Sequence, residues 1–128
     1  MKQNWWKFVA SIFLIYSLIA GFLLPIPELN ILEQSIRNLF FHVPMWFSMM
    51  AMMFISLWYS IKYLNSNKTI YDIKASAFAQ VGFVLGLLGI TTGSVWAKVT
   101  WGAWWVFSEP KLNGAAAALL VYAAYFIL

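Results

Sequence analysis

The chain has 128 residues, of which 63% are hydrophobic, 20% aromatic and only 9% charged, and its net charge is +4. Soluble domains carry roughly a quarter charged residues, so this composition excludes an ordinary soluble domain and indicates a membrane protein. The eight basic residues are scattered between apolar stretches and form no patch for phosphate groups, which argues against a nucleic-acid partner. Because cysteine is absent, disulfides, thiolate metal sites, a cysteine nucleophile and thioether attachment of a cofactor are excluded.

The first apolar stretch runs from Phe8 to Leu24 and follows Lys2 and Lys7. It resembles the start of a secretory signal, but no A-x-A-like cleavage site follows it, so we predict an uncleaved first transmembrane helix. The next segment, 25–41, interleaves acidic and basic residues with apolar ones. This pattern predicts a short amphipathic helix lying on the membrane.

The second apolar stretch runs from His42 to Ile61 and contains five of the six methionines. Pro44 follows His42 by two positions, and a proline disfavours helical geometry in the residue before it, so we expect His42 just before the helix, at the membrane interface. The methionines are open to two interpretations. We favour soft side chains that fill gaps between helices over an axial ligand for a metal.

The third and fourth apolar stretches run from Ala75 to Val95 and from Gly114 to Leu128, and segment 63–74, with an Asn-Ser-Asn turn signal, predicts a loop before the third. The third stretch has four glycines on one helical face, which predicts a close helix–helix contact. These are Gly82, Gly86, Gly89 and Gly93. The fourth stretch would give roughly 22 Å of helix, short of a full crossing. We therefore predict an all-α, polytopic membrane bundle in one domain, 1–128, with three full transmembrane helices and the start of a fourth.

The distribution of basic residues predicts the orientation of the bundle. Five would lie on one side of the membrane: Lys2, Lys7, Lys62, Lys68 and Lys74. Three would lie on the other: Arg37, Lys98 and Lys111. The positive-inside rule then places the N-terminus in the cytoplasm, and His42 faces outward with the tryptophan-rich segment 96–113. In a bacterium with two membranes that side is the periplasm.

Segment 96–113 reads WAKVTWGAWWVFSEPKLN and holds four of the eight tryptophans. A helix through it would present Trp101, Trp104 and Trp105 on one face, because they are spaced i, i+3 and i+4. Together with one imidazole and a few cations, such a surface has what a haem needs: aromatic walls, an axial ligand and partners for the propionates. From the residues alone, however, the indoles are equally well explained as interfacial anchors. A lone histidine such as His42 is more often a hydrogen-bonded interfacial residue than a metal ligand.

Two motifs add a resemblance to a known family. The stretch GSVWAKVTWGAWWVFSEPKLNG resembles the tryptophan-rich WWD signature of the CcmC and CcsA haem-handling proteins of cytochrome c maturation, and FFHVPMW resembles the His-Val-Pro segment of CcmC. The resemblance implies a six-helix protein of the bacterial inner membrane, of which this chain would be an N-terminal portion. Such a protein holds haem at the periplasmic face and delivers it to a periplasmic haem chaperone, with ABC-type transporter subunits as further partners.

The resemblance also implies a role for individual residues. His42 would be an axial ligand of the iron of haem b, and the second histidine of the family would lie beyond this chain. The segment around the macrocycle would comprise Trp96, Trp101, Gly102, Trp104, Trp105, Phe107 and Lys111. Here Gly102 keeps the spacing tight, Phe107 stands where the family has tryptophan, Lys111 stands where it has arginine, and Glu109 is a candidate for the motif's acid.

Two other classes of function remain as alternatives. One is a structural or interaction subunit of a membrane complex, whose aromatic residues are anchors only. The other is a membrane redox enzyme, which would need histidines on two spans. The chain shows no activated nucleophile, paired intramembrane carboxylates or phosphate loop, so we expect transport rather than catalysis.

Overall fold

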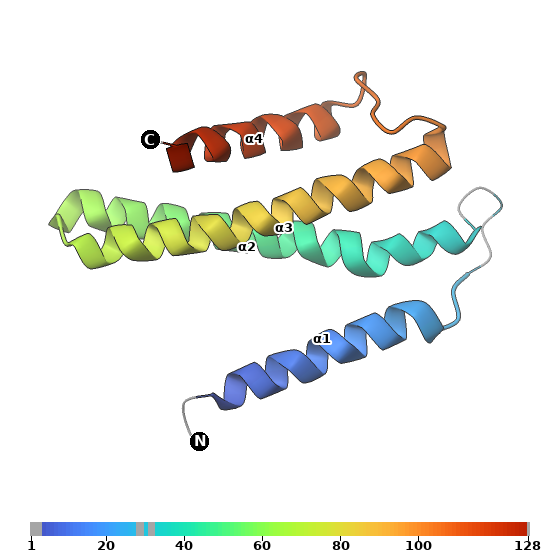
Figure 1. The fold of residues 1–128 in the computed structure, drawn as a ribbon, viewed down its shortest axis with the longest axis horizontal. Coiled ribbons are helices and arrows are strands. Elements are labelled where there is room, and N and C mark those ends of the chain that lie inside the picture. Colours follow the sequence, from blue (N-terminus) through green and yellow to red (C-terminus); the bar gives the residue numbers. More distant parts are fainter. Residues whose placement is uncertain (1–3, 28–29, 31–32, 128) are drawn as a thin grey trace.

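The computed structural model describes residues 4–27, 30 and 33–127. All regular secondary structure in these residues is helical. Helix α1 (Trp5–Leu23) is followed by a 3-10 helix, η1 (Glu33–Asn38), and then by α2 (Leu39–Ser66), α3 (Thr69–Trp101) and α4 (Pro110–Ile127). All four α-helices are long and apolar enough to cross a membrane. They run in alternating directions (Figure 1), which confirms the predicted all-α, polytopic bundle.

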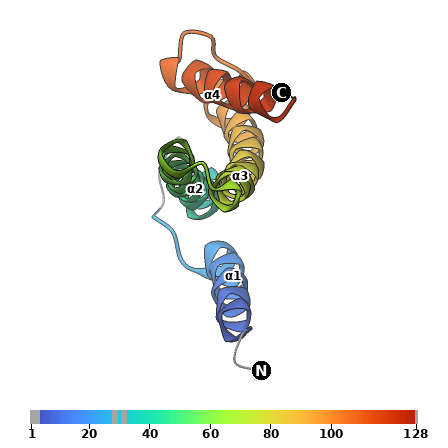
Figure 2. The same ribbon diagram turned by 90° about the vertical axis from the view of Figure 1, so that its left-hand side faces the viewer.

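The centre of the bundle is the antiparallel pair α2 and α3 (Figures 1 and 2). The predicted glycine face of α3 makes this contact: Gly82 lies against Met52 and Met53. A Cβ atom at Gly82 would lie 3.0 Å from Cε of Met53. The glycines therefore let the two backbones approach closely while methionine side chains fill the remaining space, as the sequence predicted.

The outer helices lie on opposite sides of this pair (Figure 2). Helix α4 packs on α3 where Leu119 covers Gly86. Helix α1 contacts the rest of the bundle near its C-terminal end, where Phe22 packs on Phe41 with ring centroids 5.2 Å apart. Most large apolar side chains of α1 are exposed. Contacts within the described residues therefore hold little of this helix, which hydropathy marks as long and apolar enough to cross a membrane.

The structure corrects the position expected for His42. This residue lies inside α2, which already begins at Leu39. Helix η1 leads directly into α2, so helical geometry is established before the chain reaches the proline. Pro44 then removes one hydrogen-bond donor, whose helical acceptor would be the carbonyl of Phe40, and the helix accepts this cost close to its start.

The prediction of a loop at 63–74 is also wrong, because only Asn67 and Lys68 separate α2 from α3. Asn67 adopts the left-handed conformation, with φ of 51°, and its N–H donates to the carbonyl of Tyr63 at 2.7 Å. One asparagine in this conformation reverses the chain direction, since asparagine tolerates positive φ better than most residues. The remaining polar residues of the predicted loop extend the two helices.

Two further expectations change. In the segment predicted as an amphipathic helix, only η1 and the first turn of α2 are helical in the described residues, while residues 28–29 and 31–32, like Lys2, lie outside them. Helix α4 begins at Pro110, ahead of the predicted Gly114, and so has 18 residues, which is long enough to cross a membrane. Proline suits the first position of a helix, where its missing N–H would have no helical partner.

Candidate functional site

The candidate site lies at one end of the bundle, the right-hand end in Figure 1. The end of α1, the start of α2, the end of α3 and the start of α4 all lie there. This arrangement brings His42 of α2 close to Trp96 of α3 and to Lys111 of α4, three residues predicted from the sequence. The turn at Asn67 and Lys68 lies at the opposite end.

Both ring nitrogens of His42 have hydrogen-bond partners, and the ring is partly buried. Its Nδ1 lies 3.0 Å from Oγ1 of Thr92 on α3. Its Nε2 accepts a hydrogen bond of 3.1 Å from the indole Nε1 of Trp46, one turn further along α2. Gly93 provides the space for the ring, since a Cβ atom there would lie 2.8 Å from Cε1 of His42. The imidazole is thus held in one orientation by two helices.

An apolar cavity of about 450 Å³ opens beside this imidazole, between α2, α3 and α4. It is lined by His42, Trp46, Met50, Gly89, Ile90, Gly93, Lys111, Leu112 and Ala115. Its volume falls in the range of roughly 300 to 1,000 Å³ typical of small-molecule sites. One imidazole and one ammonium group are therefore the ionisable groups of a largely apolar cavity.

These donors suit a haem better than a bare metal ion. Within the described part of the chain, no group of three or more histidine, cysteine, aspartate or glutamate side chains is placed to hold a metal. A protein-bound metal ion usually needs three or four such ligands. A haem iron needs only one or two protein ligands, because the porphyrin supplies the others. A single imidazole beside an apolar cavity satisfies that requirement.

Trp96 supports His42. Its ring meets the imidazole edge-on, with centroids 6.1 Å apart. The indole Nε1 donates a hydrogen bond of 3.2 Å to Oγ of Ser35 in η1, and the side chain is partly buried. Trp96 thus ties α3 to the segment that leads into α2, close to the residue it supports.

The remaining tryptophans do not share a helix face, contrary to the expectation from their spacing. Helix α3 ends at Trp101, and Gly102 adopts a φ of 77°. Residues with a Cβ atom rarely adopt this left-handed conformation, whereas glycine does so readily. The N–H of Gly102 donates to the carbonyl of Lys98, and the ammonium of Lys98 donates back to the carbonyl of Gly102 at 2.8 Å. This glycine cap stops the helix, so Trp104 and Trp105 follow in an irregular segment.

The end of α3 and the irregular segment 102–109 present aromatic rings at the surface. Trp101, the last residue of α3, is 56% exposed, and Trp104 and Phe107 in the segment are 58% and 83% exposed. Trp105 is partly buried, and its Nε1 donates to Oδ1 of Asn113 at 3.2 Å. Asn113 also donates from Nδ2 to the carbonyl of Phe107 at 2.7 Å, which ties the segment to α4. Of the predicted site residues, only His42 and Lys111 line the cavity, and His42 contacts Gly93 across the helix contact. The aromatic residues Trp101, Trp104, Trp105 and Phe107 do not line it.

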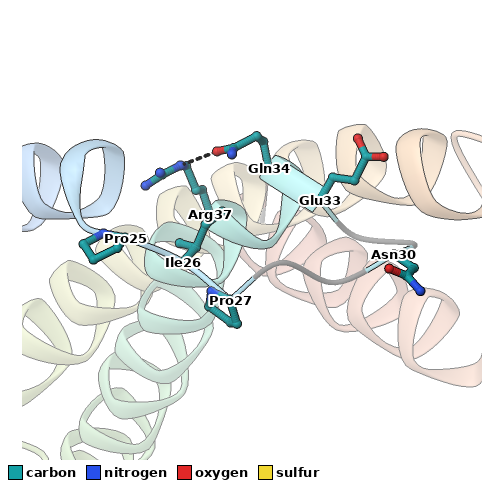
Figure 3. Close-up of a pocket in the computed structure, with 7 residues that line it drawn as sticks. All are labelled: Pro25, Ile26, Pro27, Asn30, Glu33, Gln34 and Arg37. Atoms are coloured by element: carbon teal, nitrogen blue, oxygen red, sulfur yellow. Dashed lines mark hydrogen bonds between the residues drawn. The ribbon is translucent and has the colours of Figure 1, made fainter.

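A larger hollow, of about 730 Å³, lies where α1 leads into η1 (Figure 3). Arg37 borders it, but its guanidinium is already engaged: Nη1 donates to the carbonyls of Gly21 and Leu24, and Nε donates to Gln34. Arg37 therefore satisfies carbonyl groups at the end of α1. Because this hollow has neither an imidazole nor an aromatic wall, we place the site in the smaller cavity.

The model of the CcmC family, described as "Heme exporter protein C", matches residues 1–128, the whole chain. The chain belongs to the CcmC family. The heme exporter protein C of Paracoccus denitrificans (strain Pd 1222) is 31% identical over 116 residues, which cover 87% of this chain and 45% of that protein. The Escherichia coli (strain K12) protein of the same name is 30% identical over 102 residues, or 74% of this chain and 38% of that protein.

A second group of relatives matches a shorter stretch. The cytochrome c biogenesis protein CcsA of Prochlorococcus marinus (strain MIT 9515) is 51% identical over 45 residues, which cover 35% of this chain and 14% of that protein. No solved structure matches the chain. The chain spans less than half the length of each of these relatives.

Sequence reasoning missed two residues around the imidazole, Trp46 and Thr92. Met50, one of the five methionines interpreted from the sequence mainly as gap fillers, lines the cavity. For Trp46 a signal was present, because residues four apart on a helix lie on the same face. Thr92 lies next to Gly93 on the face of α3 that the glycines turn toward α2. Its role depends on how α2 and α3 are rotated about their axes, which the chain's own periodicity does not give.

Proposed function

We propose that this CcmC-family chain binds haem b between α2, α3 and α4 and delivers it for cytochrome c biogenesis at the periplasmic face of the bacterial inner membrane. The observation that carries the proposal is the oriented imidazole of His42 beside an apolar cavity with Lys111 on its wall. The names of the relatives, heme exporter protein C and cytochrome c biogenesis protein CcsA, point the same way.

In this proposal His42 would hold the iron of a bound haem through Nε2. Thr92 fixes the ring by accepting a hydrogen bond from Nδ1–H, as the second partner of a metal-bound histidine usually does. Lys111 pairs with a propionate, although its ammonium lacks the planar fork that arginine offers a carboxylate. Because the chain has no cysteine, it holds the haem without a thioether bond, which is the reason for proposing haem b.

The last residue of α3 and the irregular segment that follows would cover the exposed part of a bound macrocycle. Trp101 at the end of α3 and Trp104 and Phe107 in the segment would supply surface rings. Trp105 anchors the segment to α4, and Gly102 sets its direction at the end of α3. Rings that remain accessible at the membrane surface are suited to contact with a periplasmic haem chaperone. We propose that chaperone and the ABC-type transporter subunits of the cytochrome c maturation system as partners, with transfer of haem rather than catalysis as the activity.

The test is a haemin titration of the chain in lipid nanodiscs, followed by the Soret absorption band, with His42→Ala compared with wild type. We expect the variant to lose affinity by about 100-fold or more, because removing even an outer partner of a metal ligand costs about 10- to 100-fold. Ser48→Ala is the matched control, because Ser48 is an exposed residue of the same helix that does not line the cavity.

Two results would contradict the proposal. If the wild-type chain shows no Soret band that depends on His42, the imidazole has only its packing role. If the chain binds no haemin at all, the aromatic residues revert to interfacial anchors of a structural subunit.

A further inference from the structure

The hydrogen bond from Trp46 to His42 fixes more than the orientation of the imidazole. An indole N–H can only donate, so Nε2 of His42, 3.1 Å away, must be the acceptor. In a neutral imidazole the other nitrogen then carries the proton. Nδ1–H accordingly donates to Oγ1 of Thr92, whose own hydroxyl donates to the carbonyl of Leu88 at 2.8 Å. The four groups form one consistent chain of donors and acceptors.

This chain of hydrogen bonds occupies the one lone pair that could bind a metal. The lone pair of Nε2 points to the indole of Trp46, while Nδ1 carries a proton and has none to offer. The ring is therefore in the correct tautomer for coordination through Nε2, with its other nitrogen already held by Thr92. The indole N–H occupies the position that a metal would take.

The indole is placed there by the helix contact. Trp46 lies over Gly89 of α3, and a Cβ atom at Gly89 would come within 2.8 Å of Cε2 of Trp46. The absence of a side chain at Gly89 thus leaves room for the indole of Trp46. Trp46 also lines the 450 Å³ cavity, so its ring borders the space that the proposed function assigns to the haem.

We propose that the Trp46 indole is a latch on His42: its hydrogen bond holds Nε2 in the ligand-free chain, and its release exposes the nitrogen for coordination. This inference rests on the proposed function and adds a step to it. The latch keeps a lone imidazole satisfied inside an apolar region between deliveries, since a buried acceptor without a donor is costly. The Trp46 hydrogen bond would thus compete with haem for Nε2, which would lower the affinity for haem and favour its transfer onward.

The first test reads the hydrogen bond without any ligand. The chain has one histidine, so selective nitrogen-15 labelling of histidine gives the resonances of a single imidazole. In nanodiscs without haemin we expect the neutral ring to carry its proton on Nδ1. Trp46→Phe keeps an aromatic ring but removes the donor, so the Nε2 resonance should shift. Trp58→Phe, an exposed tryptophan further along the same helix, is the control and should leave it unchanged.

The second test adds haemin to the same proteins. We expect Trp46→Phe to bind haemin about two- to tenfold more tightly than wild type, which corresponds to one net hydrogen bond, and Trp58→Phe to bind like wild type. A purely structural role for the Trp46 contact predicts the opposite sign, because a loosened imidazole would bind haemin more weakly.

The outcomes separate the latch from the function on which it rests. A proton on Nε2 in the ligand-free wild type, or equal or weaker haemin binding by Trp46→Phe, overturns the latch; if His42 is still required for binding, the proposed function stands. If neither wild type nor Trp46→Phe binds haemin, the proposed function fails and the latch fails with it.

Discussion

Trp96 and Trp104 belong to the same tryptophan-rich segment, yet their surroundings differ. Trp96 is partly buried, donates to Ser35 and lies edge-on against His42. Trp104 is 58% exposed in the irregular segment beyond Gly102. The contrast teaches that the segment has two parts divided at the glycine cap. The helical part belongs to the scaffold that holds the imidazole, and the irregular part offers its rings to the surroundings.

The largest expected effect breaks the scaffold side of this comparison. Trp96→Ala removes a partly buried indole and its hydrogen bond between α3 and η1, so we expect it to lower the free energy of unfolding by about 2 to 3 kcal/mol, below the cost of a fully buried tryptophan. Trp104→Ala is the matched change in the exposed part, and it should change the free energy of unfolding by no more than about 0.5 kcal/mol. Denaturant titration in detergent micelles measures both, and equal losses would erase the distinction.

A smaller effect sharpens the other side. Under the proposed function, Trp104→Ala should weaken haemin binding by about 0.5 to 1.5 kcal/mol, the usual contribution of one aromatic contact, while stability is unchanged. Trp58→Ala makes the same replacement at a 60% exposed tryptophan further along α2, away from the cavity, and should not alter affinity. Titration of both variants with haemin checks this. If both lose affinity equally, the effect comes from membrane anchoring.

The smallest effect concerns the attachment of the irregular segment to α4. Asn113→Ala removes the acceptor for Trp105 and the donor to the carbonyl of Phe107. Because Asn113 is exposed, we expect a loss of about 0.5 to 1 kcal/mol, confined to the segment. Hydrogen exchange of the amides in 102–109 should speed up, and exchange in α2 should not. Asn65→Ala, at an exposed asparagine near the end of α2, is the control. If Asn113→Ala leaves hydrogen exchange in 102–109 unchanged, Asn113 does not attach this segment to α4.

The transmembrane helices and the glycine contact could be predicted because hydropathy and a periodic pattern record them directly in the sequence. The helix ends could not, because they depend on backbone conformation. Asn67 and Gly102 end α2 and α3 through positive φ values, well outside the apolar stretches. The prediction that Trp101, Trp104 and Trp105 share one helix face was wrong for this reason. Their spacing is helical, but α3 ends at Trp101, before the other two tryptophans.

His42 could be identified from its resemblance to a known motif and from its being the only imidazole of the chain. Its meeting with Trp96 at one end of the bundle agrees with the predicted arrangement of spans. The hydrogen bonds to Trp46 and Thr92 could not be predicted, since they depend on the rotation of α2 against α3. The roles of the predicted site residues toward haem remain predictions, and the titrations above test them.

The two-residue turn at Asn67 and Lys68 has a consequence for biosynthesis. Helices α2 and α3, with 28 and 33 residues, are joined so tightly that neither can enter the bilayer in an orientation independent of the other. They must insert as one hairpin. Lys62, Lys68 and Lys74 cluster around its tip, and moving that cluster across the hydrocarbon core would be costly. By the positive-inside rule, we expect these three lysines to favour the cytoplasmic side and so to place His42 on the opposite one.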